Sequence, residues 1–277
     1  MIRDATIADR DALARLGLRV PEGPRAGVLH PAHHVLVMEE QGLITGAAHL
    51  RSGGLPPEVT GPVPMELVRL VAHDATAESL LEAAMAAAVR RGARTLWASG
   101  ARGFVRPLAG PEGVPEIVEF RDGHAGGFYA LNRFWLDQHG LYEPADEAQL
   151  ADPWGAFLEP GGAILIALIG DAVVGTSAVV PHAPGEAEVA KLTVVPGLRG
   201  QGLGRRLVEA SLARVRADGY RRAVLVSSSK LGQALRLYES LGFERRPLPP
   251  DVAYATADVW MELEVGPAAP APGQGHR

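Results

Sequence analysis

The feature that most constrains this chain is an apolar strand that runs through a proline into a glycine-rich turn and a helix. Residues 188–208 read EVAKLTVVPGLRGQGLGRRLV. Such a turn exposes consecutive backbone N–H groups at a helix N-terminus, where the unpaired donors and the helix dipole attract an anion. Glycine suits the turn because it allows positive φ and the close approach of a ligand. We therefore expect an anion site at the start of this helix.

Two common nucleotide sites do not fit the same turn. No Gly-Lys-Ser/Thr follows it, as a Walker loop requires. The spacing Gly200-Gln201-Gly202 lacks the third glycine of a dinucleotide fingerprint. A pyrophosphate ligand is still compatible with this glycine-rich turn.

Hydrophobic periodicity predicts the same order of elements twice along the 277 residues. In the first half we expect helices over 6–16 and 75–91 and strands over 35–39, 43–50, 65–72 and 95–98. In the second half we expect helices over 128–137, 203–217 and 231–241 and strands over 117–120, 163–169, 172–180, 187–195, 223–226 and 257–265. The Gly- and Pro-rich stretch 101–114 is interpreted as a linker or a remnant helix.

This pattern predicts an α/β fold of two tandem domains, each with a mostly antiparallel, mixed central sheet flanked by helices. The length agrees with about two domains. The predicted boundaries are 1–108 for the first domain, 109–114 for a linker, 115–265 for the second domain and 266–277 for a disordered tail rich in Pro, Gly and Ala.

Composition narrows the function classes. The chain has no cysteine, which excludes disulfides, cysteine metal sites and a cysteine nucleophile. A net charge of −5 argues against a nucleic-acid partner. No signal peptide is predicted, and the longest apolar run, Ala163–Ile169, is too short to cross a bilayer, so we expect a cytoplasmic protein without a membrane partner. The histidines at 30, 33 and 34 have no acidic or cysteine partner at ligand spacing, and we expect no metal.

Two motifs in the second half resemble a known family. Leu192, Val194 and Pro196, followed by the run Arg199–Gly204, are similar to motif A of the GNAT superfamily, the acetyl-CoA-dependent N-acetyltransferases. The segment ALRLYESLGF at 234–243 is similar to motif B. The resemblance covers about 115–265 and implies that the second domain is catalytic and that the chain holds tandem GNAT-like domains.

Within that family, the second domain resembles the acetyltransferase half of bacterial fusions with MarR-type regulators. The residues that carry this likeness are Leu131-Asn132, Trp135-Leu136, Pro160–Gly162 and the segment from Pro249-Pro250 to Met261-Glu262-Leu263. Mycothiol synthase also has tandem acetyltransferase domains, but the second domain resembles it only at the shared motifs, so it stays a minor alternative.

The family resemblance implies acetyl-CoA as co-substrate and direct attack of an amine on the thioester. The backbone amides of the motif A turn would hold the pyrophosphate: Arg199, Gly200, Gln201, Gly202, Leu203 and Gly204. The strand end at Val194 and Val195 would pair with the pantetheine arm and polarise the thioester carbonyl. Ser228 is expected near a further CoA contact, because Leu231 stands where motif B often has Asn.

Two side chains are expected to handle protons. Tyr238 would donate to the departing thiolate, a task that suits a phenol because it is neutral at pH 7. Glu188 falls where several family members place a general base. A packing role for Tyr238 and a structural role for Glu188 stay open as alternatives.

Three nearby residues have plainer interpretations. Lys191 is expected to make a salt bridge or line the cleft rather than catalyse. His182 is expected in a solvated loop, and Trp135 in the core.

The first domain is interpreted as a degenerate copy. Its strand 65–73 occupies the place of the motif A strand, but the following turn, Asp74–Glu78, has no glycine. Its acidic residues would repel a pyrophosphate at the helix N-terminus. We expect this domain to serve as a scaffold or as one wall of the acceptor cleft.

The sequence therefore favours an N-acetyltransferase acting on a primary amine of a small molecule or peptide. The negative net charge mildly favours cationic acceptors. The alternative is a non-catalytic acyl-CoA sensor that regulates a partner, and a structural pair that binds no CoA is a third interpretation. The acceptor, the acyl-chain preference and the oligomeric state stay open.

Overall fold

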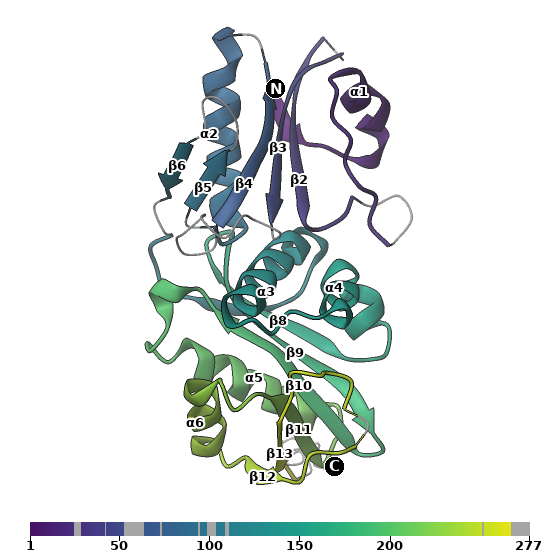
Figure 1. Cartoon of the computed structure of the whole chain (residues 1–277), viewed down its shortest axis with the longest axis vertical. Helices are drawn as coiled ribbons and strands as arrows, with labels where there is room; N and C mark the ends of the chain where they lie inside the picture. The colour runs from purple at the N-terminus through teal and green to yellow at the C-terminus, as the bar shows by residue number, and fades with distance from the viewer. Residues whose placement is uncertain are drawn as a thin grey trace, which may run out of the picture.

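The computed structural model describes residues 1–24, 29–41, 43–52, 64–72, 74–93, 95–98, 104–108, 111–250 and 252–266. These residues form two sheets with their helices, one above the other along the longest axis of the molecule (Figure 1). The predicted α/β fold with mostly antiparallel sheets is confirmed.

The first domain is a six-stranded sheet in the order β1-β2-β3-β4-β5-β6. Its elements are β1 (Ile2–Asp4), the 3₁₀ turn η1 (Ile7–Asp9), α1 (Arg10–Arg15), β2 (His33–Glu40), β3 (Leu43–Ser52), β4 (Pro64–Val71), α2 (Asp74–Arg90), β5 (Thr95–Ala98) and β6 (Phe104–Pro107).

The second domain is a seven-stranded sheet in the order β12-β13-β11-β10-β9-β8-β7. Its first elements are β7 (Glu116–Glu119), η2 (Asp122–His124), α3 (Ala125–His139), α4 (Pro144–Ala151), the π-helical turn η3 (Trp154–Leu158), β8 (Ala163–Ile169) and β9 (Ala172–Ala183). The remaining elements are β10 (Glu186–Val194), η4 (Pro196–Leu198), α5 (Leu203–Ala217), β11 (Arg222–Ser227), α6 (Gly232–Ser240), β12 (Glu244–Arg246) and β13 (Val259–Glu264).

The two sheets share one topology. Among the described strands, each sheet has one parallel pair, β4–β5 in the first and β10–β11 in the second, joined through α2 and α5 respectively. The order β1 to β6 is thus repeated by β7 to β11 and β13. The two copies differ in their connections. Between β7 and β8 the second copy has the additional helix α4. Five residues separate β5 from β6, whereas the β11–β13 connection contains the nine-residue helix α6 and the strand β12.

Several elements differ from the sequence prediction. Residues 104–107, interpreted as linker or remnant helix, form the edge strand β6, and an edge position tolerates a proline that cannot donate to a ladder. Helix α4, η3 and the short strands β1 and β12 were not predicted; β12 is three exposed charged residues that pair with β13. Residues 109–110 of the predicted linker, His73 and the tail from 267 lie outside the described residues.

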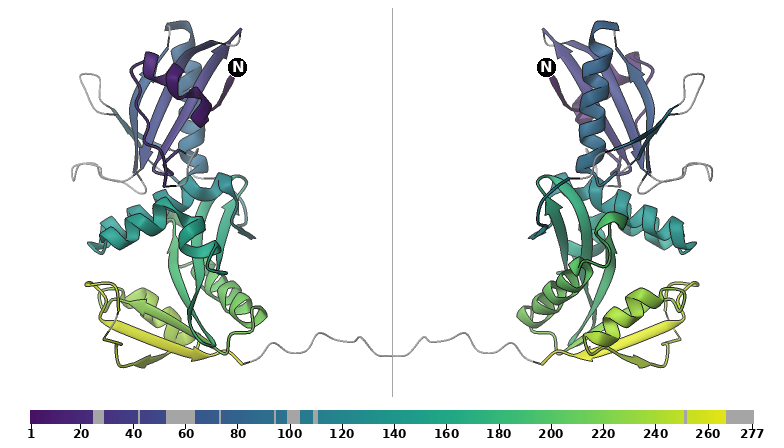
Figure 2. Two further views of the ribbon diagram at one scale, coloured as in Figure 1. Left: turned by 90° about the vertical axis from the view of Figure 1, so that its right-hand side faces the viewer. Right: turned by 90° about the vertical axis from the view of Figure 1, so that its left-hand side faces the viewer.

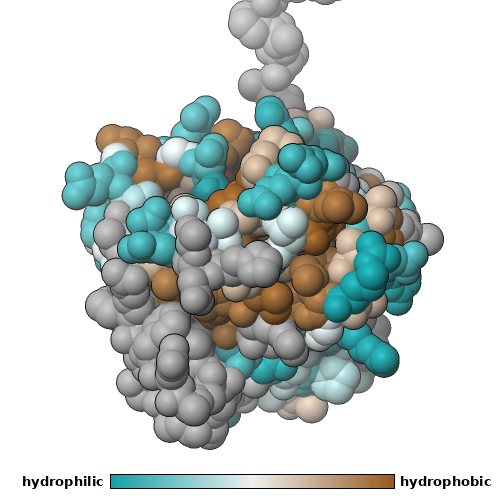
Figure 3. Space-filling view, turned by 90° about the horizontal axis from the view of Figure 1, so that it is seen from above, coloured by the Kyte–Doolittle hydropathy of each residue, from teal (hydrophilic) through white to brown (hydrophobic). Residues whose placement is uncertain are grey.

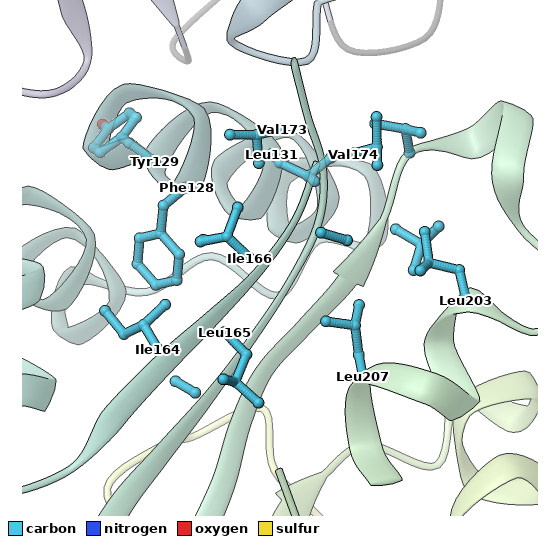
Figure 4. Packing of buried hydrophobic residues seen from close by; sticks show 14 of the residues in the cluster. Phe128, Tyr129, Leu131, Ile164, Leu165, Ile166, Val173, Val174, Leu203 and Leu207 are labelled. Carbon is cyan, nitrogen blue, oxygen red and sulfur yellow. The ribbon is translucent and has the colours of Figure 1, made fainter. Parts of the chain in front are cut away.

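The core of the second domain holds α3 and α5 against the sheet (Figure 4). Phe128 and Leu131 of α3 pack with Ile164 and Ile166 of β8, and Leu207 of α5 belongs to the same cluster. Burying one such side chain stabilises the fold by about 1.5–3 kcal/mol. This core anchors α3, which lines the candidate cavity, and α5, which follows the glycine-rich turn.

The two domains also share their cores. Ala130 of α3 packs in the core of the first domain, and Ala32, before β2, packs in the core of the second. Gly92 follows α2 at φ +82, and a Cβ there would lie 2.7 Å from the carbonyl oxygen of Val173 in β9. Figure 2 shows α3 directly beneath the sheet of the first domain. The domain boundary is therefore a close contact.

Seen from above, the end of the molecule formed by the first domain carries an apolar band bordered by hydrophilic side chains (Figure 3). Leu43, at the start of β3, is 68% exposed.

Among the described residues, none of the helices has the length and apolar character needed to cross a bilayer.

Candidate active site

The candidate site lies where two parallel strands of the second sheet separate. Strands β10 and β11 pair only from Glu186 to Glu188 of β10, opposite Arg222 to Val224 of β11. Beyond this point a cavity of about 140 Å³ opens, lined by the two strands, by α3 and α6, and by residues 254–257. The gap leaves the backbone edge of β10 without a strand partner on that side.

A bulge in β10 shapes the gap. The pairing of β10 with β9 shifts between Ala190 and Thr193, and Lys191 has φ +51. The hydroxyl of Thr176 on β9 donates to the carbonyl oxygen of Lys191 at 2.7 Å, and Asn132 Nδ2 donates to that hydroxyl oxygen at 3.1 Å. Thr176 and Asn132 are both buried. This polar chain from α3 through β9 fixes the bulge.

Lys191 makes a buried ion pair. Its Nζ lies 2.6 Å from Asp146 Oδ1 on α4 and 3.4 Å from the hydroxyl oxygen of Tyr254. The side chains of Lys191 and Asp146 are 8% and 2% exposed. The prediction that Lys191 makes a salt bridge or lines the cleft is confirmed, since it does both.

Glu188 and Tyr238 line the same cavity. Burial raises the pKa of the half-buried Glu188 carboxyl, and nearby His182 and Lys191 lower it. Tyr238 is buried on α6 with its ring edge-to-face against Phe243, at 5.8 Å between centroids, and burial raises the pKa of its phenol. In the described part of the chain the Tyr238 hydroxyl makes no hydrogen bond. The cavity thus brings together the carboxyl of Glu188 and the neutral phenol of Tyr238, beside the Lys191–Asp146 pair and Tyr254.

The turn before α5 has the expected backbone. Gly200 and Gly202 have φ +76 and +84, and a Cβ at either would meet no atom within 4 Å, so the positive φ is the reason for glycine there. Gly204 differs, because a Cβ would lie 3.6 Å from Leu237 Cδ2, an ordinary contact. Within the described residues, the six amides of 200–205 have no hydrogen-bond acceptor, and Arg206 N is the first to bond, to the carbonyl oxygen of Gly202. Free amides of this kind at a helix N-terminus are suited to bind an anion.

Only one of the two valines at the strand end faces the gap. Val195 N donates to the Val174 carbonyl oxygen of β9 at 3.0 Å. Because backbone groups alternate along a strand, those of Val194 point away from β9, toward the gap. The Val194 carbonyl accepts a bond from Arg199 Nε at 2.9 Å, and Arg199 Nη2 is buried without a partner in the described residues.

The remaining sequence candidates occupy defined places. Ser228 is buried and lines the cavity, and its carbonyl caps the turn to α6 by accepting from Leu231 N at 2.9 Å. Trp135, expected in the core, is half-buried and lines the cavity. His182, expected in a loop, is an exposed residue of β9 with its ring 5.3 Å from that of Trp260. His182 is thus exposed as expected but lies on a strand, whereas Trp135 borders the cavity instead of the core.

Comparison with known proteins assigns the family. The model of the acetyltransferase (GNAT) family matches residues 128–243. The mycothiol acetyltransferase of Thermobispora bispora is 33% identical over 254 residues, which cover 86% of this chain and 78% of that protein. The chain belongs to the GNAT acetyltransferase family. It is accordingly an acyltransferase.

Further relatives agree with this assignment. The mycothiol acetyltransferase of Salinispora arenicola is 30% identical over 258 residues, which cover 78% of this chain and 79% of the Salinispora protein. Alignments of this length span both domains. From the sequence we expected the likeness to be restricted to the shared motifs, and this expectation was wrong. A crystal structure of a GNAT acetyltransferase from Staphylococcus aureus aligns at a TM-score of 0.51 and 16% identity over 55% of this chain and 99% of that chain, which shows the fold alone.

Sequence reasoning missed the side of the cavity formed by Asp146 and by Tyr254 to Ala257. Asp146 lies on the unpredicted helix α4, and Tyr254 lies in a segment without regular structure. Glu143, just before α4, accepts bonds from the backbone N of Ala255 at 3.1 Å and of Thr256 at 2.9 Å, which fixes this segment beside the cavity. The usable signal was Pro144 with acidic residues after it, a helix start.

A larger cavity, of about 940 Å³, lies between the two domains and shares no lining residue with the first. It is bordered by Arg91 at the end of α2 and by Gly126 at the start of α3. Nearby, His33 Nδ1 and His49 Nε2 lie 2.8 Å apart, and burial lowers the pKa of each to about 4. No group of three or more metal-ligating side chains occurs among the described residues.

Proposed function

We propose that the second domain transfers the acetyl group of acetyl-CoA to a primary amine by direct attack in a ternary complex. The observation that carries this proposal is the row of six acceptor-free amides at 200–205, beside a strand gap that contains both Glu188 and Tyr238. An anion-binding turn next to a proton donor and a proton acceptor is what acyl transfer from a pyrophosphate-bearing thioester requires.

The proposed roles follow from position. The free amides of Gly200 to Gly204 hold the pyrophosphate, whereas the Arg199 amide, proposed from sequence for the same task, already donates to the Pro196 carbonyl oxygen. The backbone of Val194 and Val195 aligns the pantetheine arm, with Val194 the one whose groups face the gap. Ser228 contacts the arm from the opposite strand. Glu188 takes a proton from the attacking amine, and Tyr238 gives its proton to the thiolate as the C–S bond breaks. Proximity supplies much of the rate, and no step needs a metal.

For the acceptor, the relatives give the first class to test. Proteins named mycothiol acetyltransferase match over both domains, so we propose the amine that becomes acetylated in mycothiol as the leading acceptor. Glu188 supports an amine acceptor, because a cavity carboxylate attracts an ammonium group. The finer resemblance to MarR-fused acetyltransferases and the cytoplasmic location stay predictions.

For the first domain, we propose a degenerate copy that binds no CoA at Asp74–Glu78. The missing glycines of that turn support this, as does the five-residue β5–β6 connection, which is shorter than α6. The domain instead supports the α3 side of the second domain.

The test is a thermal-shift titration with acetyl-CoA and CoA, paired with thiol release over a panel of amines. A ligand at 100 times its Kd stabilises by about 2.7 kcal/mol, which at this chain length raises Tm by about 5–10 °C. The chain has no cysteine, so the protein adds no thiol to the measurement, and for an acceptor that carries its own thiol the released CoA is separated by chromatography. A shift with thiol release on one amine class is the expected result. A shift without release would favour the acyl-CoA sensor, and no shift would exclude the proposed role of residues 199–204.

A further inference from the structure

Lys191 lines the same cavity as Glu188, although a regular strand would separate them. Residues three apart on a strand point to opposite faces of the sheet. The bulge between Ala190 and Thr193, with Lys191 at φ +51, interrupts this alternation, and both residues line one cavity. A non-glycine residue in this conformation costs about 1–2 kcal/mol. Lys191 therefore keeps an unfavourable backbone conformation, and in this conformation it borders the same cavity as Glu188.

The ammonium group of Lys191 is held in one place. Asp146 Oδ1 lies 2.6 Å from it, the Tyr254 hydroxyl oxygen 3.4 Å, and the Tyr254 ring centroid 5.5 Å. These contacts join β10 to α4 and to the segment after β12. Because the pair is buried, salt screens its field only weakly.

Charged and titratable groups surround Glu188 from the neighbouring elements. Lys191 lies on its own strand, and the elements packed around it contribute His182 of β9, Asp146 of α4, Tyr238 of α6 and Tyr254 of the 252–258 segment. Burial favours the neutral acid, whereas His182 and Lys191 favour the carboxylate. His182 is exposed, so its influence falls with salt. Lys191 is the buried cation of the set.

We propose that Lys191, held by Asp146, is a positioning residue whose fixed charge favours the carboxylate form of Glu188. It does not touch the reacting atoms; its fixed charge opposes the effect of burial. The link to catalysis rests on the proposed function, because only an ionised Glu188 can take a proton from the amine. The electrostatic part stands without that function.

The direct test is a ¹³C NMR titration of the Glu188 side-chain carboxyl in the full chain, with the resonance assigned by Glu188→Gln. Lys191→Met removes the cation and should raise the Glu188 pKa by about one unit. Asp146→Asn leaves the cation unneutralised and should lower it. The double variant should return toward wild type, and Lys191→Arg should stay near it. His182→Gln is the matched control, whose shift should vanish in 0.5 M salt.

Opposite shifts in Lys191→Met and Asp146→Asn would establish the role. An unchanged Glu188 pKa, or shifts of the same sign, would overturn it. If Lys191→Met does not fold by circular dichroism, the sign of the Asp146→Asn shift decides alone. The titration needs no turnover, so opposite shifts without acetyl transfer would overturn the proposed function and leave this inference standing. With turnover, the acid limb of kcat/KM should move in the same directions.

Discussion

At the scale of single residues, burial acts on Tyr238 and Glu188 in the same direction but serves their proposed tasks differently. It raises the pKa of the Tyr238 phenol, which keeps the proton on the group that must donate it. It also raises the pKa of Glu188, which disfavours the carboxylate that must accept a proton. A phenol therefore needs only an apolar wall here, whereas the carboxyl needs a cation nearby.

Replacing Tyr238 by Phe should lower kcat by about 100-fold or more, the usual contribution of a positioned general acid. The affinity for CoA should change less than about twofold, because the phenol lies on α6 and not in the turn at 199–204. Thiol release at saturating substrate and calorimetric titration of CoA measure the two effects. Wild-type turnover in this variant would restrict Tyr238 to packing.

Replacing Glu188 by Gln should remove the acid limb of the pH profile of kcat/KM. A general base works only when deprotonated, so activity should fall as the pH drops through a pKa that burial has raised above the usual carboxyl value of about 4.3. The variant should be about 100-fold slower on its plateau. Rates from pH 5 to 9 measure this, and an acid limb that persists would assign it to another group.

At the scale of elements, the turn before α5 contains two kinds of glycine: one whose positive φ requires glycine, and one whose backbone does not. Gly202 caps the helix at φ +84, whereas Gly204 has an ordinary helical backbone with room for a methyl group. Gly202→Val should abolish most of the thermal shift with CoA, while Gly204→Ala should keep it and leave Tm within about 2 °C. Titrating both variants alongside wild type checks this, and equal CoA shifts would remove the turn from the binding site.

How far sequence predicts each element depends on how its residues contact the core. The apolar runs of β8 and β9 and the stripe on α5 were predicted, because burial imposes a period on their side chains. Helix α4 reads PADEAQLA, and only Asp146 and Leu150 of it are buried, so it gives no such period. The bulge at Lys191 depends on Thr176 and Asn132 from other elements, and no local pattern in β10 predicts it. The glycine-rich turn was therefore predictable, and the α4 side of the cavity was not.

At the scale of the whole molecule, the shared cores make the two domains one unfolding unit. Ala130 and Ala32 each pack in the core of the other domain, and Gly92 contacts β9. Gly92→Ala should destabilise the chain by about 1–3 kcal/mol, because a Cβ would come within 2.7 Å of the Val173 carbonyl at a positive φ. Differential scanning calorimetry should show one transition in wild type and a lower Tm in the variant. Two separate transitions in wild type would contradict this view of the boundary.

The two sheets repeat one topology, but only the second is accompanied by helix α6, so we assign the proposed catalysis to the second sheet. Both have a parallel strand pair joined by a long helix, α2 or α5. Only the second has α6, which carries Tyr238. The first sheet thus has the frame of the second without the residue proposed to protonate the leaving group.

Helix α3 borders both cavities, Gly126 near its start lining the large one and Trp135 near its end lining the small one. Its 15 residues make a rod about 22 Å long. A tilt of about 3° about its first turn displaces its last turn by about 1 Å, and a misplacement of that size can cost about 100-fold in rate. The alignment of groups at the proposed site of acyl transfer therefore depends in part on how firmly the first domain holds the start of α3.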